Sequence, residues 1–125
     1  MNIIMMAHGT LANSLLKSTK MILGPIDNRV QAIDFGANES LEQLSNKLEK
    51  QLNKEMNLIF CDLKGGTPFN TAYLLRQKYP IKIVCGMNLG MLLEYFMHAL
   101  SNDELPSLAI AKDAGIKAIE VFDLD

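Results

Sequence analysis

The amino-acid sequence predicts one α/β domain, in which a doubly wound, mainly parallel sheet is covered by helices on both faces. Short, continuously apolar runs alternate along the chain with segments whose apolar residues recur at helical spacing. Continuous apolar runs are typical of strands that are buried on both faces of a parallel sheet. A chain of 125 residues without a low-complexity tract or a linker fits a single domain, which we expect to span residues 1–125.

The first half of the chain predicts two strands and two helices in alternation. An apolar run from Asn2 to Ala7 forms the first strand, and a helix from about Leu11 to Leu23 ends at a Gly-Pro pair. The second strand is predicted over Val30 to Phe35, and Asn38 or Ser40 can cap the second helix. The apolar stripe of that helix consists of Leu41, Leu44, Leu48 and Leu52.

The third strand is predicted over Leu58 to Cys61, and Asp62 follows it at once. A glycine turn then leads into a helix that runs to about Lys78. Thr67 suits the N-cap of this helix, because its hydroxyl can accept a backbone hydrogen bond. Pro68 suits the first helical position, where its missing N–H is not needed.

The last third of the chain repeats the pattern and ends in a candidate fifth strand. Ile81 to Cys85 is the fourth strand, helical spacing follows over Met91 to Leu100, and a further helix over Pro106 to Ala114 is expected to end at Gly115. Ile116 to Phe122 then predicts a strand. We expect the order 2-1-3-4 for the first four strands, and the end strand pairs either within the molecule or with a partner subunit.

Composition and charge exclude several classes of function. The formal net charge is −2, with 12 basic and 14 acidic residues mixed along the chain, which rules out the basic patch of a nucleic-acid-binding protein. No apolar segment approaches the ~20 residues of a membrane span, and the N-terminus lacks the basic region of a signal peptide. We therefore expect a cytoplasmic protein. Cys61 and Cys85 lie in apolar runs, which is typical of reduced, buried cysteines.

Two predicted strand ends carry the residues that could perform chemistry. Ligands of open α/β sheets bind beyond the carboxyl ends of the strands, where the strand order reverses. In the order 2-1-3-4, His8 and Asp62 face each other across this point. An imidazole can attack phosphorus or accept a proton, and a carboxylate on its other nitrogen fixes the tautomer. The simpler alternative is a histidine that only hydrogen-bonds to backbone.

The glycine turn before the third helix predicts an anion site. Gly65 and Gly66 allow the backbone to approach a ligand, and the start of a helix presents unpaired N–H groups. Together with Thr67, and with Gly9 and Thr10 after the first strand, these groups could bind a phosphate. An ordinary strand-to-helix turn is the alternative. The chain has no Walker motif, and its two histidines and two cysteines lack metal-ligand spacing, so we expect no metal and no cofactor.

Three motifs follow one another along the chain: AHG at residues 7–9, DLKGGTPFN at residues 62–70 and GMNLGMLLE at residues 86–94. In these motifs the sequence resembles the IIA component of the mannose-type family of the bacterial phosphoenolpyruvate-dependent sugar phosphotransferase system. That family serves mannose, fructose, sorbose and N-acetylgalactosamine. The likeness covers essentially the whole chain, and GGTPFN is its most specific part.

The resemblance implies a phosphohistidine carrier. His8 would receive a phosphoryl group from the small carrier protein HPr and pass it to a histidine of the IIB component. IIB then phosphorylates a sugar that enters through the membrane components IIC and IID, so the chain would meet the membrane only through its partners. In the family, the residue matching Asp62 orients the histidine ring and the residue matching Thr67 lies close to the phosphate. Members are typically homodimers in which the C-terminal strand crosses to the other subunit.

The chain departs from the family pattern at two places. Many relatives continue into a IIB domain, whereas this sequence stops at Asp125, so IIB is expected to be a separate polypeptide. Leu63 and Lys64 stand where some relatives have an aromatic residue, and Lys64 adds a positive charge near the phosphate.

Three alternatives stay open beside the carrier. One is the phosphocarrier subunit of a dihydroxyacetone kinase system, and another is a IIA-like regulatory or docking module. The third is a small hydrolase that uses His8 and Asp62, although the sequence offers it no convincing nucleophile. Which sugar is transported also stays open, because specificity is expected in the membrane components and partly in IIB.

Overall fold

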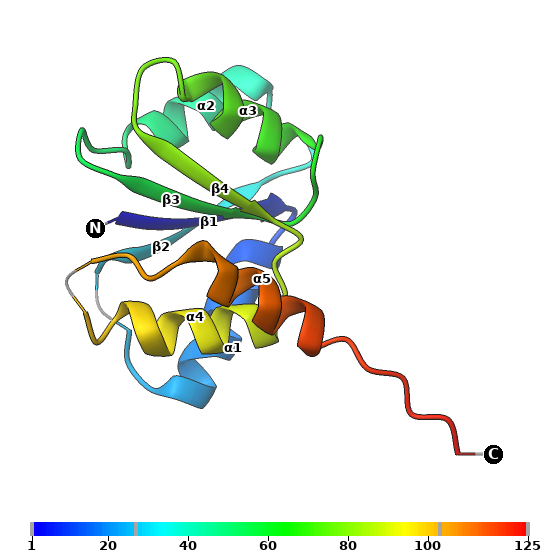
Figure 1. Ribbon diagram of the computed structural model, residues 1–125. Coiled ribbons are helices and arrows are strands. Elements are labelled where there is room, and N and C mark those ends of the chain that lie inside the picture. The colour runs from blue at the N-terminus through cyan, green and yellow to red at the C-terminus, as the bar shows by residue number, and fades with distance from the viewer. Residues whose placement is uncertain (1, 27, 103, 125) are drawn as a thin grey trace.

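The computed structural model describes residues 2–26, 28–102 and 104–124, which form three layers (Figure 1). In this part of the chain, four parallel strands form a sheet in the order β2-β1-β3-β4. The strands are β1 (Asn2–His8), β2 (Val30–Phe35), β3 (Asn57–Cys61) and β4 (Ile81–Cys85). The predicted fold class and the predicted strand order are both confirmed.

Helices cover both faces of this sheet, as Figure 1 shows. One face carries α1 (Leu11–Leu23), α4 (Leu89–Ala99) and α5 (Leu108–Lys117). The other face carries α2 (Leu41–Glu49) and α3 (Thr67–Leu75), and α3 ends earlier than its pattern predicts. Because the sheet is covered on both sides, its central strands are continuously apolar rather than alternating.

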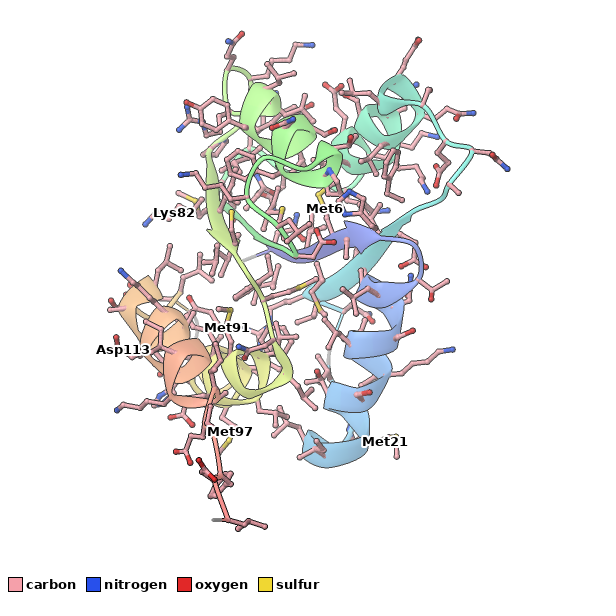
Figure 2. The ribbon with its side chains drawn as sticks, turned by 90° about the vertical axis from the view of Figure 1, so that its right-hand side faces the viewer. Met6, Met21, Lys82, Met91, Met97 and Asp113 are labelled. Carbon is pink, nitrogen blue, oxygen red and sulfur yellow. The ribbon has the colours of Figure 1, made fainter. Side chains whose placement is uncertain are left out.

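The side chains of β1 lie at the centre of the core, and Ile3 through Ala7 are all fully buried. Successive side chains of a strand point to opposite faces. Met5 therefore packs with Tyr95 on the side of α1 and α4, whereas Met6 packs with Leu44 on the side of α2 and α3. Figure 2 shows Met6 on this second side. Packing on both faces fixes the strand that leads into His8.

The start of α2 follows the sequence prediction, and the start of α3 does not. The hydroxyl of Ser40 accepts the Gln43 N–H at 3.1 Å, and the Gln43 side chain accepts the Ser40 N–H at 2.8 Å. This reciprocal pair is a capping box. The predicted N-cap of α3 is wrong, because Gly66 is the N-cap, Thr67 is the first helical residue and Pro68 is the second. Pro68 is still tolerated there, since the first N–H groups of a helix have no intrahelical acceptor.

The C-terminal segment differs most from the prediction. Gly115 does not end the last helix, since α5 continues to Lys117, and the predicted strand start at Ile116 is therefore wrong. Gly115 is buried against α4, where an added Cβ would lie 2.8 Å from Cε of Met91. Glycine thus allows close helix packing here rather than a helix end. Residues 119–124 form no strand within the described chain and extend away from its body (Figure 1).

A buried amide network joins the starts of β1 and β3. Asn57 is fully buried, and its side-chain carbonyl accepts the Asn2 amide at 2.8 Å and the Asn53 N–H at 2.9 Å. Its amide group donates to the carbonyl oxygens of Asn53 at 2.8 Å and Pro80 at 3.1 Å. Both hydrogen-bonding functions of the Asn57 side chain are therefore satisfied inside the protein.

Replacing Asn57 by alanine should lower the free energy of unfolding by about 3 kcal/mol or more, because each buried group left without a partner costs roughly 1–3 kcal/mol. Urea denaturation measures this change. Asn46→Ala is the matched control, since Asn46 is exposed on α2, and it should change the free energy by less than about 0.5 kcal/mol. If the two substitutions had equal effects, the network would not stabilise the sheet.

Candidate functional site

The register of β1 against β3 brings His8 and Asp62 together. The two strands pair in parallel with Met6 opposite Cys61. His8 ends β1, and Asp62 directly follows β3. The Nδ1 atom of His8 lies 2.8 Å from Oδ2 of Asp62, and the backbone N–H of His8 donates to the same oxygen at 3.1 Å. The structure thus places in contact the two side chains that the strand order led us to pair.

This contact decides which nitrogen of the ring is free. An ionised carboxylate can only accept hydrogen bonds, so Nδ1 of His8 carries the proton and Nε2 of the neutral ring carries the lone pair. Burial raises the pKa of the Asp62 carboxyl, but hydrogen bonds from the side chain and backbone of His8 and from the Leu63 N–H outweigh it and lower that pKa. The His8 side chain is 44% exposed and that of Asp62 only 11%. The ring is therefore accessible, while the carboxylate that orients it is shielded.

Sequence reasoning missed Phe35, the last residue of β2. Its ring meets the His8 ring edge to face, with centroids 6.0 Å apart and planes at 71°. His8 and Phe35 are register partners, so the strand end on the other side of β1 was the available signal. The Gly9 N–H donates to the Phe35 carbonyl oxygen at 2.8 Å. This bond removes the Gly9 N–H from the predicted phosphate-binding groups.

The turn from Gly65 to Thr67 leads into α3 beside the histidine. Gly65 has a φ of +84°, a conformation that residues with a side chain rarely adopt, so the turn requires glycine there. The Asn70 N–H donates to the Gly66 carbonyl oxygen at 2.9 Å, which begins the hydrogen bonding of α3. The Thr67 N–H precedes this bond and has no acceptor within the helix. Together with the positive end of the helix dipole, such an N–H group favours an anion.

A second helix begins at the same edge of the sheet, directly after His8. Thr10 is the N-cap of α1, and its side chain makes no capping hydrogen bond. The Asn13 N–H instead donates to Oδ1 of Asp34 at 3.2 Å. The Thr10 hydroxyl is therefore not used to cap α1. Both α1 and α3 start where β1 and β3 end.

The two cysteines are poor nucleophiles, and the second histidine lies on α4, away from the end of β1. Both cysteines are free thiols. Burial raises the pKa of the Cys61 thiol, and it also raises that of Cys85, where the charge of Lys64 acts in the opposite direction. Neither thiol is therefore activated as a thiolate. His98 lies on α4, where its Nε2 is 3.4 Å from Oε1 of Glu94.

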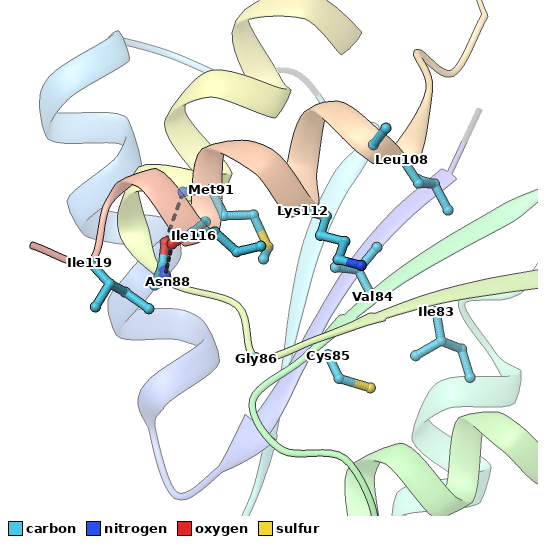
Figure 3. Close-up of a pocket in the computed structure, with 12 residues that line it drawn as sticks. Ile83, Val84, Cys85, Gly86, Asn88, Met91, Leu108, Lys112, Ile116 and Ile119 are labelled. Atoms are coloured by element: carbon cyan, nitrogen blue, oxygen red, sulfur yellow. Dashed lines mark hydrogen bonds between the residues drawn. The ribbon is translucent and has the colours of Figure 1, made fainter.

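Within residues 2–26, 28–102 and 104–124, no group of three or more His, Cys, Asp or Glu side chains is placed to hold a metal ion. No helix in the same ranges is both long and apolar enough to cross a bilayer. A cavity of about 530 Å³ lies between β4 and α5, and His8 does not line it (Figure 3). Its walls include Ile83 and Val84 on β4 and Lys112 and Ile116 on α5.

Fold and site together define a doubly wound α/β domain that presents a histidine–aspartate pair at the carboxyl edge of its sheet. The model of the EIIA-man family, described as the fructose IIA component of the PTS, matches residues 2–111. The chain therefore belongs to the mannose-type IIA family of the phosphotransferase system, as its motifs indicated.

Individual relatives agree with this assignment. The mannose-specific EIIAB component of the PTS from Escherichia coli (strain K12) is 36% identical, over 94% of this chain and 39% of the relative. The sorbose-specific EIIA component from Klebsiella pneumoniae is 33% identical, over 79% of this chain and 76% of the relative. The solved mannose/sorbose specific IIA subunit from Enterococcus faecalis has a TM-score of 0.86 at 33% identity, over 99% and 96% of the two chains. The chain thus spans about two fifths of the length of the mannose-specific relative.

Acidification should destabilise the protein as Asp62 becomes protonated. A carboxyl whose folded-state pKa lies below its unfolded value of about 3.9 stabilises the fold above that value, and the contribution is lost as the pH falls through the folded-state pKa. The free energy of unfolding should therefore fall more between about pH 5 and pH 2 in the native sequence than in Asp62→Asn. Urea denaturation across this range compares the two proteins. Equal losses would show that His8 does not lower the Asp62 pKa.

Proposed function

We propose that this chain is a phosphohistidine carrier, in which His8 accepts a phosphoryl group from phospho-HPr and passes it to a histidine of a IIB component. The observation that carries the proposal is the 2.8 Å contact between Nδ1 of His8 and Asp62. It leaves Nε2 as the nucleophile on a ring that is 44% exposed. A partner protein can reach such a ring, which a relay between two proteins requires.

The transfer balances with the groups at hand. The lone pair of Nε2 forms a bond to phosphorus while the bond between phosphorus and the donor breaks, and the donor keeps that electron pair. The His8 ring then carries a positive charge with its proton still on Nδ1. Asp62 stabilises this charge and remains ionised. Passing the group on reverses the same steps, so the site returns to its initial state.

The equatorial oxygens of the phosphoryl group need stabilising charge rather than covalent chemistry. The N–H groups of Gly66 and Thr67 at the start of α3 can supply it, together with the hydroxyls of Thr67 and Thr10. Gly65 contributes by letting the backbone turn at this place. Lys64, next to the turn, adds a positive charge. These groups make the proposed phosphate site.

The proposed relay also implies partners and a place in the cell. The chain would act in the cytoplasm and would reach the membrane components IIC and IID only through IIB. The identity of the acceptor is what separates this relay from one that serves a dihydroxyacetone kinase. The printed names of the relatives supply the sugar classes to test first, which are mannose, sorbose and fructose.

His8→Ala should abolish phosphorylation by phosphoenolpyruvate, enzyme I and HPr, whereas His98→Ala should be phosphorylated at the rate of the native sequence. His98 is the matched control, because it is the other histidine of the chain and is also paired with a carboxylate. Mass spectrometry of the treated proteins should show one added phosphate that is stable to alkali and labile to acid. Phosphorus NMR should place it on Nε2.

Asp62→Ala should keep the fold and slow the transfer by about 100-fold, because the ring loses its orientation.

Labelled phosphate that still became attached to His8→Ala would overturn the proposal. Addition of a purified IIB component should discharge the phosphorylated chain, and discharge only by a dihydroxyacetone kinase would favour that alternative relay.

We also propose that two copies associate through the C-terminal segment. β4 is an edge strand of the described sheet, and beside it lies the apolar cavity of about 530 Å³. The segment after α5 carries large apolar side chains that are 73–94% exposed, namely Ile119, Val121, Phe122 and Leu124. Pairing of this segment with β4 of a second copy would cover the edge, the cavity and these side chains together.

Substitution of Phe122 by aspartate should convert a dimer into a monomer, because a charge would enter the apolar contact. Light scattering coupled to size-exclusion chromatography measures the mass. Met97→Asp is the matched control: Met97 is also an exposed apolar residue, but it lies on α4, and its variant should stay dimeric. A native chain that is monomeric at micromolar concentration would contradict this proposal and leave the carrier assignment intact.

A further inference from the structure

The two adjacent glycines of the turn before α3 differ in backbone conformation. Gly65 has a φ of +84°, and this positive value accounts for glycine at that position. Gly66 has a φ of −75° and a ψ of 169°, which every L residue adopts easily. Backbone conformation therefore does not explain why residue 66 is glycine.

The space around Gly66 does explain it. A Cβ atom at this position would lie 2.8 Å from Cε1 of His8 and 3.4 Å from its Nε2. The first distance is too short for two carbon atoms, whose optimal separation is about 3.5–4.0 Å. The next nearest atom is Cβ of Leu63, at an ordinary contact distance of 3.8 Å. The conflict is thus with the imidazole ring alone.

The ring has little freedom to withdraw without losing its orientation. Its Nδ1 is 2.8 Å from Asp62, and the ring makes an edge-to-face contact with the Phe35 ring, with centroids 6.0 Å apart. The position that a Gly66 side chain would occupy lies on a third side, along the edge that carries Cε1 and Nε2. A methyl group there would push the ring off Asp62 and would also stand beside the nitrogen that attacks phosphorus.

We infer that Gly66 is a positioning residue for His8, whose missing side chain allows the imidazole to stay on Asp62 with Nε2 open. The inference rests on the proposed function, because it explains the missing side chain of Gly66 by the need to orient the ring that accepts the phosphoryl group. It adds a steric role to the one expected for Gly66, which was to let the backbone approach the phosphate. The glycine pair thus combines one conformational and one steric requirement.

The test is Gly66→Ala, studied in the free protein and in the phosphorylation assay. We expect phosphorylation by HPr to slow by about 100-fold, as for other misplacements of a reacting group by about 1 Å. Carbon NMR should show that the Asp62 pKa rises in the variant, since the ring no longer donates to the carboxylate. The titration reports on the ring without any partner protein.

Two control variants isolate the clash from other effects of the new methyl group. In a His8→Ala background, Gly66→Ala should leave the Asp62 pKa unchanged, because no ring remains to be displaced, while any effect on the cap of α3 is common to both backgrounds. Gly65→Ala should change the stability of the protein without changing the Asp62 pKa. It should lower Tm by roughly 5 °C through backbone strain and leave the Asp62 pKa as it is, since a Cβ there meets nothing within 4 Å.

An unchanged Asp62 pKa in folded Gly66→Ala would overturn the inference, even if phosphorylation were slow, because the methyl group would then act on the incoming phosphate. An Asp62 pKa that rose equally in the His8→Ala background would overturn it as well. Failure of the native sequence to accept phosphate would instead refute the proposed function, and the titration would still decide whether Gly66 positions the ring.

Discussion

The pairing of β1 with β3 is the constraint on which the rest of this structure depends. β1 is hydrogen-bonded on both sides and buried on both faces, so its register against β3 is set by packing above and below the sheet. A slip of one residue would turn every side chain of the strand to the opposite face. The same register puts the last residue of β1 beside the first residue after β3. The contact between His8 and Asp62 is therefore a product of core packing and needs no loop to arrange it.

The site combines rigid support from strand and helix ends with a solvent-exposed histidine ring. Its histidine is the end of a buried strand, its carboxylate is shielded, and the helices α1 and α3 both begin around it. Groups held by strands and helix starts are already oriented in the free protein, so the proposed transfer would require little reorganisation. Exposure of the ring suits the proposed relay, in which the ring would meet a donor and an acceptor in turn. The structure meets both requirements by shielding the side chain of Asp62 and exposing that of His8.

The sequence predicted the features that depend on local pattern and on general rules of sheets. Continuous apolar runs identified the strands, and the strand order then placed His8 opposite Asp62. Prediction from the sequence failed where the role of a residue is determined by contact with a residue distant in the chain. Gly115 has the signature of a helix end but packs against Met91, and no periodicity contains that contact. Phe35 was missed for the same reason. The apolar pattern after α5 is typical of a strand, yet residues 119–124 pair with no strand of the described chain, and a pattern alone does not show which edge a strand joins.

The two glycines of the turn also bear on how this sequence can vary over evolution. Gly65 answers to a backbone angle, and asparagine is the residue that most readily shares such an angle with glycine. Gly66 answers to an imidazole contributed by another strand. Position 65 should therefore tolerate asparagine. Position 66 should require glycine only while His8 is present. Relatives that lack the histidine should tolerate other residues at position 66, so that positions 8 and 66 should covary.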